Sequence, residues 1–493
     1  MEASGVQGML TARQRCSRLL QLVAWALFMV EPAVAGDPPP NVVMIVADDL
    51  GWADISPNNP DTFYETPNLE RLAARGVRFT HAYAAAPVCS PTRASLMTGR
   101  HPARLRTTDY FCGKRSGALI PADYECALPL EETTIAEHLA AEGYGTFFAG
   151  KWHLGPEGFW PEDQGFQVNR GGWTRGGPYG GEKYFSPYGN PRLDDGPEGE
   201  HLPDRLARET ATFIRERKDT PFLAVLSFYS VHTPLMGPED LVAKYRARKQ
   251  ELETGPIWGR ERARKVRLVQ EHAVYASMVE SMDAAVGIVL DAIDDAGIAD
   301  DTIIVFFSDN GGLSTSEGHP TSNLPFRAGK GWLYEGGIRE PCIVSVPGVA
   351  MSGVVCDTPI TSHDFLPTML ELCGIDGTSA RPLDGRSMVS LLRNPDAIEP
   401  ARAIHWHYPH YGNQGGAPSG AIREGDWKLI EWFEDGSIEL YDLANDPGER
   451  TNLVLDRPEV ADRLQKALGA WRRGVDAAMP RPDPEHEAKP EAR

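Results

Sequence analysis

The sequence predicts an α/β protein with a large, mostly parallel central sheet flanked by helices. A smaller C-terminal subdomain, built on a short antiparallel sheet and a helix, is expected to follow. Continuous apolar, β-branched runs at residues 41–47 and 302–307 have the pattern of strands buried on both faces of a parallel sheet. Helical patterns alternate with such runs, which is typical of a sheet covered by helices on both sides. A chain of 493 residues suits one large domain with an appendage, or two to three domains.

The elements of the main domain can be predicted in order along the chain. The strands expected in the large sheet are residues 41–47, 145–149, 222–229 and 302–307. The helices expected beside them are residues 133–142, 203–217 and about 266–296. In the last helix, apolar side chains recur at helical spacing and predict core packing: Tyr275, Met278, Met282, Val286, Val289 and Ile293. Residues 156–200 are rich in Gly, Pro and aromatic residues without periodicity, so we expect a long surface loop, plausible as a lid.

The pattern changes after about residue 396. Residues 427–430 and 438–441 are expected to form short strands of a hairpin, and a helix is expected at 458–474. A charged, proline-containing segment follows. The domain organisation that we predict is a signal peptide at 1–35, a catalytic α/β domain at 36–395, a C-terminal subdomain at 396–480 and a disordered tail at 481–493.

The amino terminus has the pattern of an export signal. Arg13, Arg15 and Arg18 precede an apolar run at 19–30, and a small-residue cleavage site follows at 33–35. The run is shorter than the roughly 20 residues that span a bilayer. We therefore expect an exported protein, periplasmic or secreted, with no membrane span after signal removal; an uncleaved anchor is the alternative.

Charge excludes one class of function. The formal net charge of −20, without a basic block, argues against nucleic-acid binding. It also makes the protein unattractive to an anion at long range. A pocket for sulfate or phosphate must therefore be a local, partly desolvated cluster of Lys and Arg.

Seven cysteines are present, of which Cys16 would leave with the signal. In an exported protein, Cys112 and Cys126 are the first candidates for a local disulfide, although spacing alone does not establish the pairing. The remaining candidates for plain core residues are Cys342, Cys356 and Cys373.

The most informative motif is CSPTR at residues 89–93, followed by LMTGR at 96–100. It resembles the signature of the sulfatase family, C-x-P-[S/T]-R with an L-x-T-G tail. The resemblance is to formylglycine-dependent, arylsulfatase-like enzymes of the alkaline phosphatase superfamily. It implies that a formylglycine-generating enzyme oxidises Cys89 to formylglycine (3-oxoalanine), whose hydrated aldehyde is the nucleophile. The alternative is that Cys89 is a buried apolar thiol beside the start of a helix.

Further segments resemble the same family. Residues 143–146 with Gly150-Lys151-Trp152-His153 match its second signature. Asp48-Asp49, the His232-Thr233-Pro234 segment, and Asp309-Asn310 with Lys330 downstream also match. Residues 439–447 are typical of the family's C-terminal region. Together with the first motif, the main matches span roughly residues 41 to 345.

The acidic pairs after two predicted strands indicate a metal site. Asp48, Asp49, Asp309 and Asn310 offer only hard oxygen ligands, which suit Ca²⁺ or Mg²⁺ better than zinc. The family resemblance favours Ca²⁺ and places the modified Cys89 at the same ion. For either pair alone, helix capping or turn formation would be the alternative.

The resemblance also assigns the groups that handle the sulfate. Lys151 and Lys330 would hold it, and Arg93 would orient and stabilise the hydrated aldehyde. His232 would protonate the departing alcohol oxygen, and His153 would help to release sulfate and regenerate the aldehyde. Isolated lysines are usually solvated and isolated histidines usually structural, so these assignments depend on the motifs.

Substrate contacts are the least constrained part of the prediction. The candidates are Arg327, Trp173, Arg175, His405 and His407, the last two from a His-rich run with His410 and Tyr411. Weak metal binding or plain surface is the alternative for that run. By analogy we expect a sulfated sugar or polysaccharide as substrate.

Two other functions remain open at this point. One is a phosphonate or phosphate ester hydrolase of the same superfamily, although the paired lysines and the GKWHLG segment favour sulfate. The other is a non-catalytic glycan-binding protein in which Cys89 stays unmodified.

Overall fold

The computed structural model describes residues 39–111, 113, 115–376 and 381–486. The expected signal peptide at 1–35 and Cys112 lie outside the described residues, as does most of the expected tail. The export signal and the Cys112–Cys126 disulfide therefore stay predictions.

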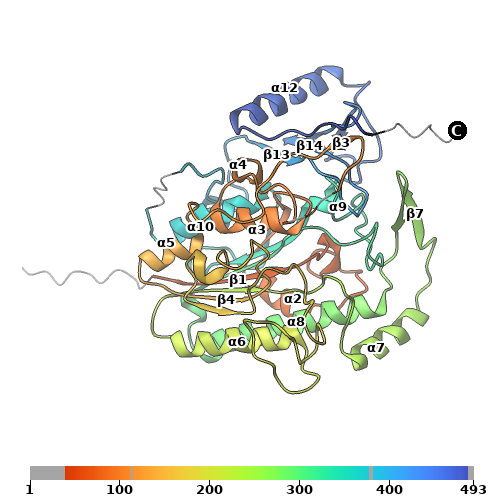
Figure 1. Cartoon of the computed structure of the whole chain (residues 1–493). Helices are drawn as coiled ribbons and strands as arrows, with labels where there is room; N and C mark the ends of the chain where they lie inside the picture. Colours follow the sequence, from red (N-terminus) through yellow and green to blue (C-terminus); the bar gives the residue numbers. More distant parts are fainter. Residues whose placement is uncertain (1–38, 112, 114, 377–380, 487–493) are drawn as a thin grey trace, which may run out of the picture. The chain divides into compact units, whose positions relative to one another are not determined.

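A nine-stranded sheet forms the centre of the main body (Figure 1). Its spatial order is β11 (Val354–Cys356), β2 (Val77–Tyr83), β10 (Arg339–Ser345), β9 (Thr302–Ser308), β1 (Asn41–Ala47), β6 (Phe222–Ser227), β4 (Gly145–Gly150) and β5 (Val168–Arg170), with β12 (Ile360–Thr361) also on β2. Every pairing is parallel except those of β10 with β2 and β9. The predicted mostly parallel sheet is confirmed, and its four predicted strands correspond to β1, β4, β6 and β9.

Helices cover both faces of this sheet. One face carries α2 (Pro67–Ala73), α6 (Leu202–Arg217) and α8 (Ala273–Asp295), and the other carries α3 (Cys89–Thr98), α5 (Ile135–Ala141) and α10 (Phe365–Leu372). Shorter or peripheral helices are α4 (Pro102–Leu105), α7 (Glu239–Gln250), α9 (Glu335–Ile338) and α11 (Val389–Arg393). Strand β1 shows why both layers are needed, because its alternate side chains enter two different apolar clusters.

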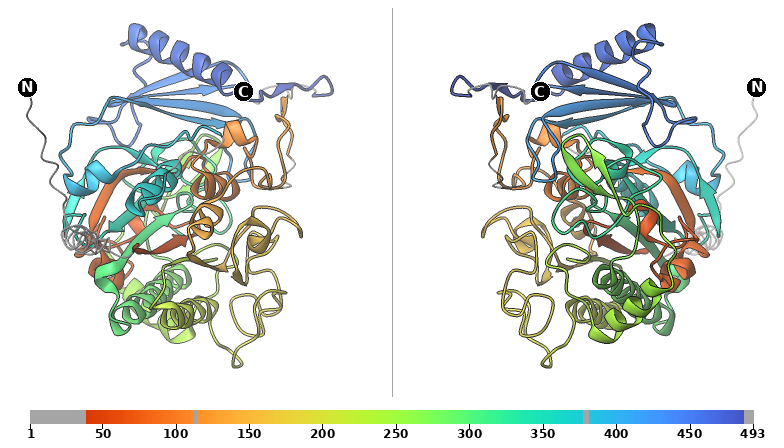
Figure 2. Two further views of the ribbon diagram at one scale, coloured as in Figure 1. Left: turned by 90° about the vertical axis from the view of Figure 1, so that its left-hand side faces the viewer. Right: turned by 90° about the vertical axis from the view of Figure 1, so that its right-hand side faces the viewer.

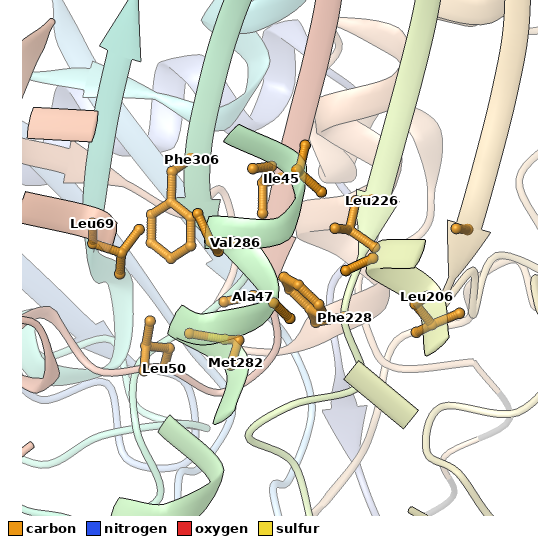
Figure 3. Packing of buried hydrophobic residues seen from close by; sticks show 14 of the residues in the cluster. Ile45, Ala47, Leu50, Leu69, Leu206, Leu226, Phe228, Met282, Val286 and Phe306 are labelled. Carbon is orange, nitrogen blue, oxygen red and sulfur yellow. The ribbon is translucent and has the colours of Figure 1, made fainter. Parts of the chain in front are cut away.

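The lower layer packs through the apolar stripe of α8. Figure 3 shows Met282 and Val286 of this helix against Ile45 of β1 and Phe306 of β9. Burying one such side chain contributes roughly 1.5–3 kcal/mol relative to leaving it exposed. By length and composition α8 is the one described helix that could cross a membrane, but most of it is buried inside the protein, as in a core helix.

Helix α8 begins later than predicted. It starts at Ala273, after His272 accepts a hydrogen bond from Tyr275 N as an N-terminal cap. The first two residues of the predicted helix, Val266 and Arg267, belong instead to β8 (Arg264–Arg267), which pairs with β7 (Trp258–Glu261) in a hairpin. Segment 156–200 is largely irregular, as expected, but it also contributes β5 to the edge of the sheet.

The C-terminal subdomain is a four-stranded antiparallel sheet: β13 (Ala403–Tyr408), β14 (Ser419–Glu424), β15 (Trp427–Trp432) and β16 (Ile438–Asp442). The predicted hairpin is β15–β16. One face packs against the main body, and α12 (Pro458–Gly474) covers the other through Leu464 and Leu468 (Figure 2). The prediction of disorder from residue 481 is corrected at its start, because β17 (Arg481–Pro482) pairs with β3 (Leu119–Ile120).

A buried ionic cluster ties this subdomain to the main body. Lys428 Nζ on β15 lies 2.9 Å from Glu335 Oε1 and 2.8 Å from Glu449 Oε1, and all three side chains are fully buried. Glu335 is the first residue of α9, five residues after Lys330. The cluster therefore fixes the subdomain close to the segment that carries a predicted site residue.

Candidate active site

The predicted site residues lie at the carboxyl edge of the central sheet. Asp48 follows β1 and Asp309 follows β9, which is the direct neighbour of β1. Lys151 follows β4, and His232 comes five residues after the end of β6. In open α/β sheets this edge is where ligands bind, because strand ends and loop residues converge there.

Three carboxylates and one thiol form a compact cluster at this edge. One ligand atom from each of Asp48, Asp49, Cys89 and Asp309 lies within 4.8 Å of the others, and all four residues are buried. Cys89 Sγ lies 3.5 Å from Asp48 Oδ1. Asn310 donates from Nδ2 to Asp49 Oδ1 at 2.8 Å, while its buried Oδ1 has no hydrogen-bond partner among the described residues. This set of oxygens, with one of them unsatisfied, fits a hard divalent cation.

Each carboxylate of the cluster has a basic partner. Lys151 Nζ lies 2.6 Å from Asp48 Oδ2, and Lys330 Nζ lies 2.9 Å from Asp49 Oδ2. Arg93 Nε donates to Asp309 Oδ2 at 2.7 Å. Buried charges are tolerated only when they are paired and hydrogen-bonded, and these ion pairs meet that condition without a bound metal.

Burial and pairing set the charge states. Burial raises the pKa of Asp48 to about 7, even though Lys151 opposes the shift. Burial also acts to raise the pKa of Asp49, but Lys330 and its other cationic neighbours more than offset this and hold it at about 2. Burial acts to lower the pKa of both lysines, but the neighbouring aspartates raise it by more. The pKa of each lysine is therefore above its usual value, and both stay charged near neutral pH.

Cys89 is chemically inert in its encoded form. It is the first residue of α3, and burial raises the pKa of its thiol well above the usual range. A thiol acts as a nucleophile or metal ligand through its thiolate, which such a pKa suppresses. An unmodified Cys89 would therefore be a poor nucleophile at this position.

Arg93 is held on several sides. Its Nη1 donates to the Lys151 carbonyl at 2.9 Å and also to Ser227 Oγ. Its Nη2 is buried, 3.9 Å from Asp48 Oδ1, and within the part of the chain that the structure describes it has no hydrogen-bond partner. Ser227, the last residue of β6, was missed by the sequence reasoning because it belongs to no motif.

Both predicted histidines border the site. His232 Nδ1 lies 2.7 Å from the Thr233 carbonyl, so this nitrogen carries the proton, while Nε2 lies 3.8 Å from Asp49 Oδ2. Burial, then the neighbouring Lys330, lowers the pKa of His232 to about 3. Burial and Lys151 lower the pKa of His153 well below its usual value, and its buried Nδ1 has no hydrogen-bond partner.

A cavity of about 390 Å³ opens above the cluster. Cys89, His153, His232 and Lys330 lie on its wall. The other lining residues are Val88, Tyr110, Phe111, Thr174, Arg175, Gly176, Tyr179, Glu317, Asn413 and Gln414. The volume is in the range of small-molecule sites. A second cavity of about 210 Å³, beside Asp364 and Arg402, contains none of the motif residues.

The predicted substrate contacts are only partly at this cavity. Arg175 lines it, with its guanidinium 5.0 Å from the ring centroid of Trp173, which packs into the core beneath. Arg327 points elsewhere, because its guanidinium pairs with Glu261 at 2.8 Å. The structure therefore does not place Arg327 on the wall of this cavity.

His405 and His407, also predicted as substrate contacts, do not line this cavity either. Both lie on β13, where His405 stacks on Trp471 of α12 at 4.6 Å between ring centroids. His407 Nε2 lies 2.8 Å from the Ala478 carbonyl. Packing against the C-terminal helix and the segment after it, rather than substrate contact, accounts for these rings.

Several cavity residues were not predicted from the sequence. Glu317 lies between Asp309 and Lys330, a segment bounded by site residues, and this position was the available signal. Asn413 and Gln414 follow the His-rich run closely, but no motif marks them. Tyr110 and Phe111 follow the first motif in the sequence, and only the fold of the chain brings them to the same cavity as Cys89.

The chain matches two family models. The model described as Sulfatase matches residues 40–375. The model described as N-sulphoglucosamine sulphohydrolase, C-terminal, matches residues 328–473. The first covers most of the central sheet and every predicted catalytic and metal-binding residue.

The chain is also similar to characterised and solved proteins. It is 32% identical to a sulfatase of Formosa agariphila, over 88% of this chain and 88% of that protein. It is 32% identical to human arylsulfatase A, over 90% of this chain and 89% of that protein. The crystal structure of Ps i-CgsB in complex with k-i-k-neocarrahexaose superposes with a TM-score of 0.73 at 26% identity, covering 88% of this chain and 92% of that one.

Proposed function

The chain belongs to the sulfatase family and is a sulfatase, and from this premise we propose that it hydrolyses a sulfate ester of a sugar. We propose that it uses a formylglycine made from Cys89 and a divalent metal ion. One observation carries the proposal: a buried Cys89 at the start of α3 sits among three aspartates, each paired with a buried cation.

The metal would be held by Asp48, Asp49, Asp309 and Asn310, next to residue 89. The ligand atoms of the cluster lie within 4.8 Å of one another. This upper limit is compatible with oxygens gathered around one Ca²⁺ or Mg²⁺ ion, and the family resemblance favours Ca²⁺. When bound, the cation supplies positive charge that stabilises negative charge developing on the sulfate oxygens.

Formylglycine explains why a cysteine with so high a pKa lies at the centre of the site. When present, it would supply a geminal diol: one hydroxyl would be the nucleophilic oxygen, and deprotonation of the other would expel sulfate and restore the aldehyde. Arg93 Nη2, which is buried and has no acceptor among the described residues, is available to donate to an oxygen substituent at residue 89. The other nitrogens of Arg93 are fixed by Asp309, Lys151 and Ser227, which orients this donor.

The lysines and histidines bind sulfate and move protons. Lys151 and Lys330 stay charged and can direct ammonium protons to sulfate oxygens. His232 presents Nε2 toward the cavity side of Asp49, because its Nδ1 proton is committed to the Thr233 carbonyl. It must therefore gain a proton at Nε2 before it can donate one to the leaving oxygen. A bound anionic sulfate favours this step, since it offsets the lysine charge that lowers the pKa of His232.

A sugar fits the cavity above these residues. Aromatic side chains, a few amides and single charged groups line it, which is the usual composition of a site that orients a polar ring. Ps i-CgsB, similar to this chain at 26% identity, was crystallised with a neocarrahexaose. We propose a sulfated saccharide as substrate on these two grounds.

The proposal can be tested in two steps on protein made in a host with a formylglycine-generating enzyme. Mass spectrometry of the tryptic peptide ending at Arg93 should show the cysteine side chain changed from CH₂SH to CHO. The same protein should hydrolyse 4-nitrophenyl sulfate, with Ca²⁺ present, faster than 4-nitrophenyl phosphate, and should release sulfate from members of a panel of defined sulfated saccharides. Cys89→Ala is the matched control.

The outcomes separate the alternatives. A strong phosphate preference would indicate a phosphate or phosphonate ester hydrolase. Unmodified Cys89 together with saccharide binding but no turnover would indicate a glycan-binding protein. Either result would overturn the proposal.

A further inference from the structure

We propose that Glu317 is the specificity-determining residue of this site, and that it selects a sugar monosulfate whose hydroxyl groups donate hydrogen bonds beside the ester. A second anionic group at that position is disfavoured. The inference rests on the proposed function and names the substrate class within it.

Glu317 is held at the cavity wall by two amides from another part of the chain. Its Oε1 accepts hydrogen bonds from Asn413 Nδ2 and, at 2.9 Å, from Gln414 Nε2. No hydrogen bond to its Oε2 is found in the described part of the chain, and the side chain is half-buried on the lining of the cavity. One carboxylate oxygen is therefore fixed while the other is open to a ligand.

The charge of Glu317 is unexpected in a site for an anion. Among the described residues it has no Lys or Arg within ion-pair distance, unlike the aspartates of the cluster. A carboxylate near the cavity weakens the attraction for sulfate, and an ionised carboxylate is an acceptor only. The open oxygen is therefore matched by a substrate donor, and sugar hydroxyls supply donors next to a sulfate ester.

The anchor of Glu317 is rigid. The carbonyl of Gln414 accepts from Thr315 Oγ1 at 2.9 Å and from Trp332 Nε1 at 3.1 Å. A side chain on Gly331 would come within 2.8 Å of Gln414 Cβ, so the two loops touch at this point. A carboxylate fixed in this way binds a hydroxyl without first losing side-chain freedom.

Aromatic rings near the two histidines complete the subsite. The ring centroid of Tyr179 lies 6.2 Å from that of His232, and the centroid of Phe111 lies 6.5 Å from that of His153. Flat apolar surfaces of this kind suit the carbon faces of a pyranose. The cavity thus combines a face for the ring with an acceptor for its hydroxyls.

The test compares two kinds of sulfate ester on the modified enzyme. The substrates are 4-nitrophenyl sulfate, which lacks hydroxyls, and the monosulfates of galactose and glucose with their disulfated counterparts. The variants are Glu317→Ala and Glu317→Gln. Thr315→Val is the matched control, because it removes a hydrogen bond to the same loop but does not line the cavity.

We expect opposite responses from the two esters. In Glu317→Ala, kcat/KM for the preferred sugar monosulfate should fall about 10- to 100-fold, mainly through KM, because hydrogen bonds to a charged acceptor are lost. For 4-nitrophenyl sulfate it should rise by up to a few-fold, because a repulsive charge is removed. Glu317→Gln keeps an acceptor oxygen and should lose less on the sugar. The ratio of kcat/KM for the monosulfated sugar to that for its disulfated counterpart should fall in both variants.

Two results would overturn the inference: an unchanged ratio of sugar to aryl sulfate turnover, or an equal fall in Thr315→Val. If the wild type hydrolyses neither ester, the proposed function fails instead. Calorimetric titration of the same sugar monosulfates then decides the role of Glu317. Weaker binding by Glu317→Ala than by Thr315→Val supports it, and equal binding overturns it.

Discussion

Replacing Lys428 by Met tests the buried ionic cluster that joins the C-terminal subdomain to the main body. The side chains are similar in length, so the change removes the charge and hydrogen bonds with little change in volume. Glu335 and Glu449 would lose an ammonium group at 2.9 and 2.8 Å, in a region without solvent exposure. Glu335 would keep the hydrogen bond from Tyr83 at 2.7 Å.

The expected loss of stability is about 3–5 kcal/mol, the usual effect of removing one partner of a buried ion pair. Burial acts to raise the pKa of Glu335, but Lys428 and nearby arginines more than offset this and hold it at about 2. The pKa of Glu449 is raised to about 7, because its burial outweighs the attraction of the same ammonium group. The contribution of Glu335 is therefore present above pH 4.5 and is lost as the pH falls through 2. Glu449 acts in the opposite sense, because its raised pKa makes the folded state lose stability as the pH rises from 4.5 through 7.

The free energy of unfolding is measured by equilibrium urea unfolding followed by tryptophan fluorescence. If refolding is incomplete, unfolding rates at a fixed urea concentration are compared instead. Lys466→Met is the control, since Lys466 pairs with Asp462 while their side chains are 76% and 62% exposed. It should change stability by less than about 0.5 kcal/mol. Adding Glu449→Gln to Lys428→Met should restore part of the loss. A loss below about 1 kcal/mol in Lys428→Met would refute the reasoning.

The remaining predictions concern the site. Cys89→Ala should abolish sulfate release while leaving the urea midpoint nearly unchanged, because it deletes one small group; near-normal turnover would contradict the mechanism. Ser227→Ala should lower kcat several-fold with little change in KM, because Arg93 loses one of its acceptors, and a pure KM effect would argue against a positioning role. Removal of divalent metal with EDTA should abolish activity and lower the thermal midpoint, and Ca²⁺ should restore both better than Mg²⁺. Burial raises the pKa of Glu340 well above its usual value, and neither carboxyl oxygen has a hydrogen-bond partner among the residues described, so the folded state keeps this proton and loses stability as the pH rises above 4.5. Glu340→Gln should therefore gain stability relative to the wild type between pH 5 and pH 8, and urea titrations showing no such trend would count against it.

The sequence was sufficient for residues whose position follows from a strand end. Asp48, Asp309 and Lys151 each come directly after a buried apolar run, and parallel strands bring such positions to one edge. The strand ends thus predict that these residues meet, whereas their chemical roles were predicted from the family motifs. The order of the strands was not needed for this step.

Residues whose role depends on loop packing could not be placed from the sequence. Arg327 is three residues from Lys330, yet its side chain turns to Glu261 on β7, part of a hairpin that the sequence did not predict. Glu317 and Gln414 are almost a hundred residues apart, and only the packing of two loops brings them together. Neither periodicity nor spacing carries information about such contacts.

The burial of the first motif in the folded protein limits when Cys89 can be modified. Cys89, Ser90, Thr92 and Arg93 are each at most 4% exposed, and they form the first turns of α3. If an enzyme must bind this segment to oxidise Cys89, as the proposed function requires, it can do so only before the chain folds. Modification and folding would then compete in time, and a chain that folds first would remain a stable but inactive species. The specific activity of a preparation would then depend on the fraction of molecules that were modified before folding. Two samples with the same melting curve could differ widely in that fraction.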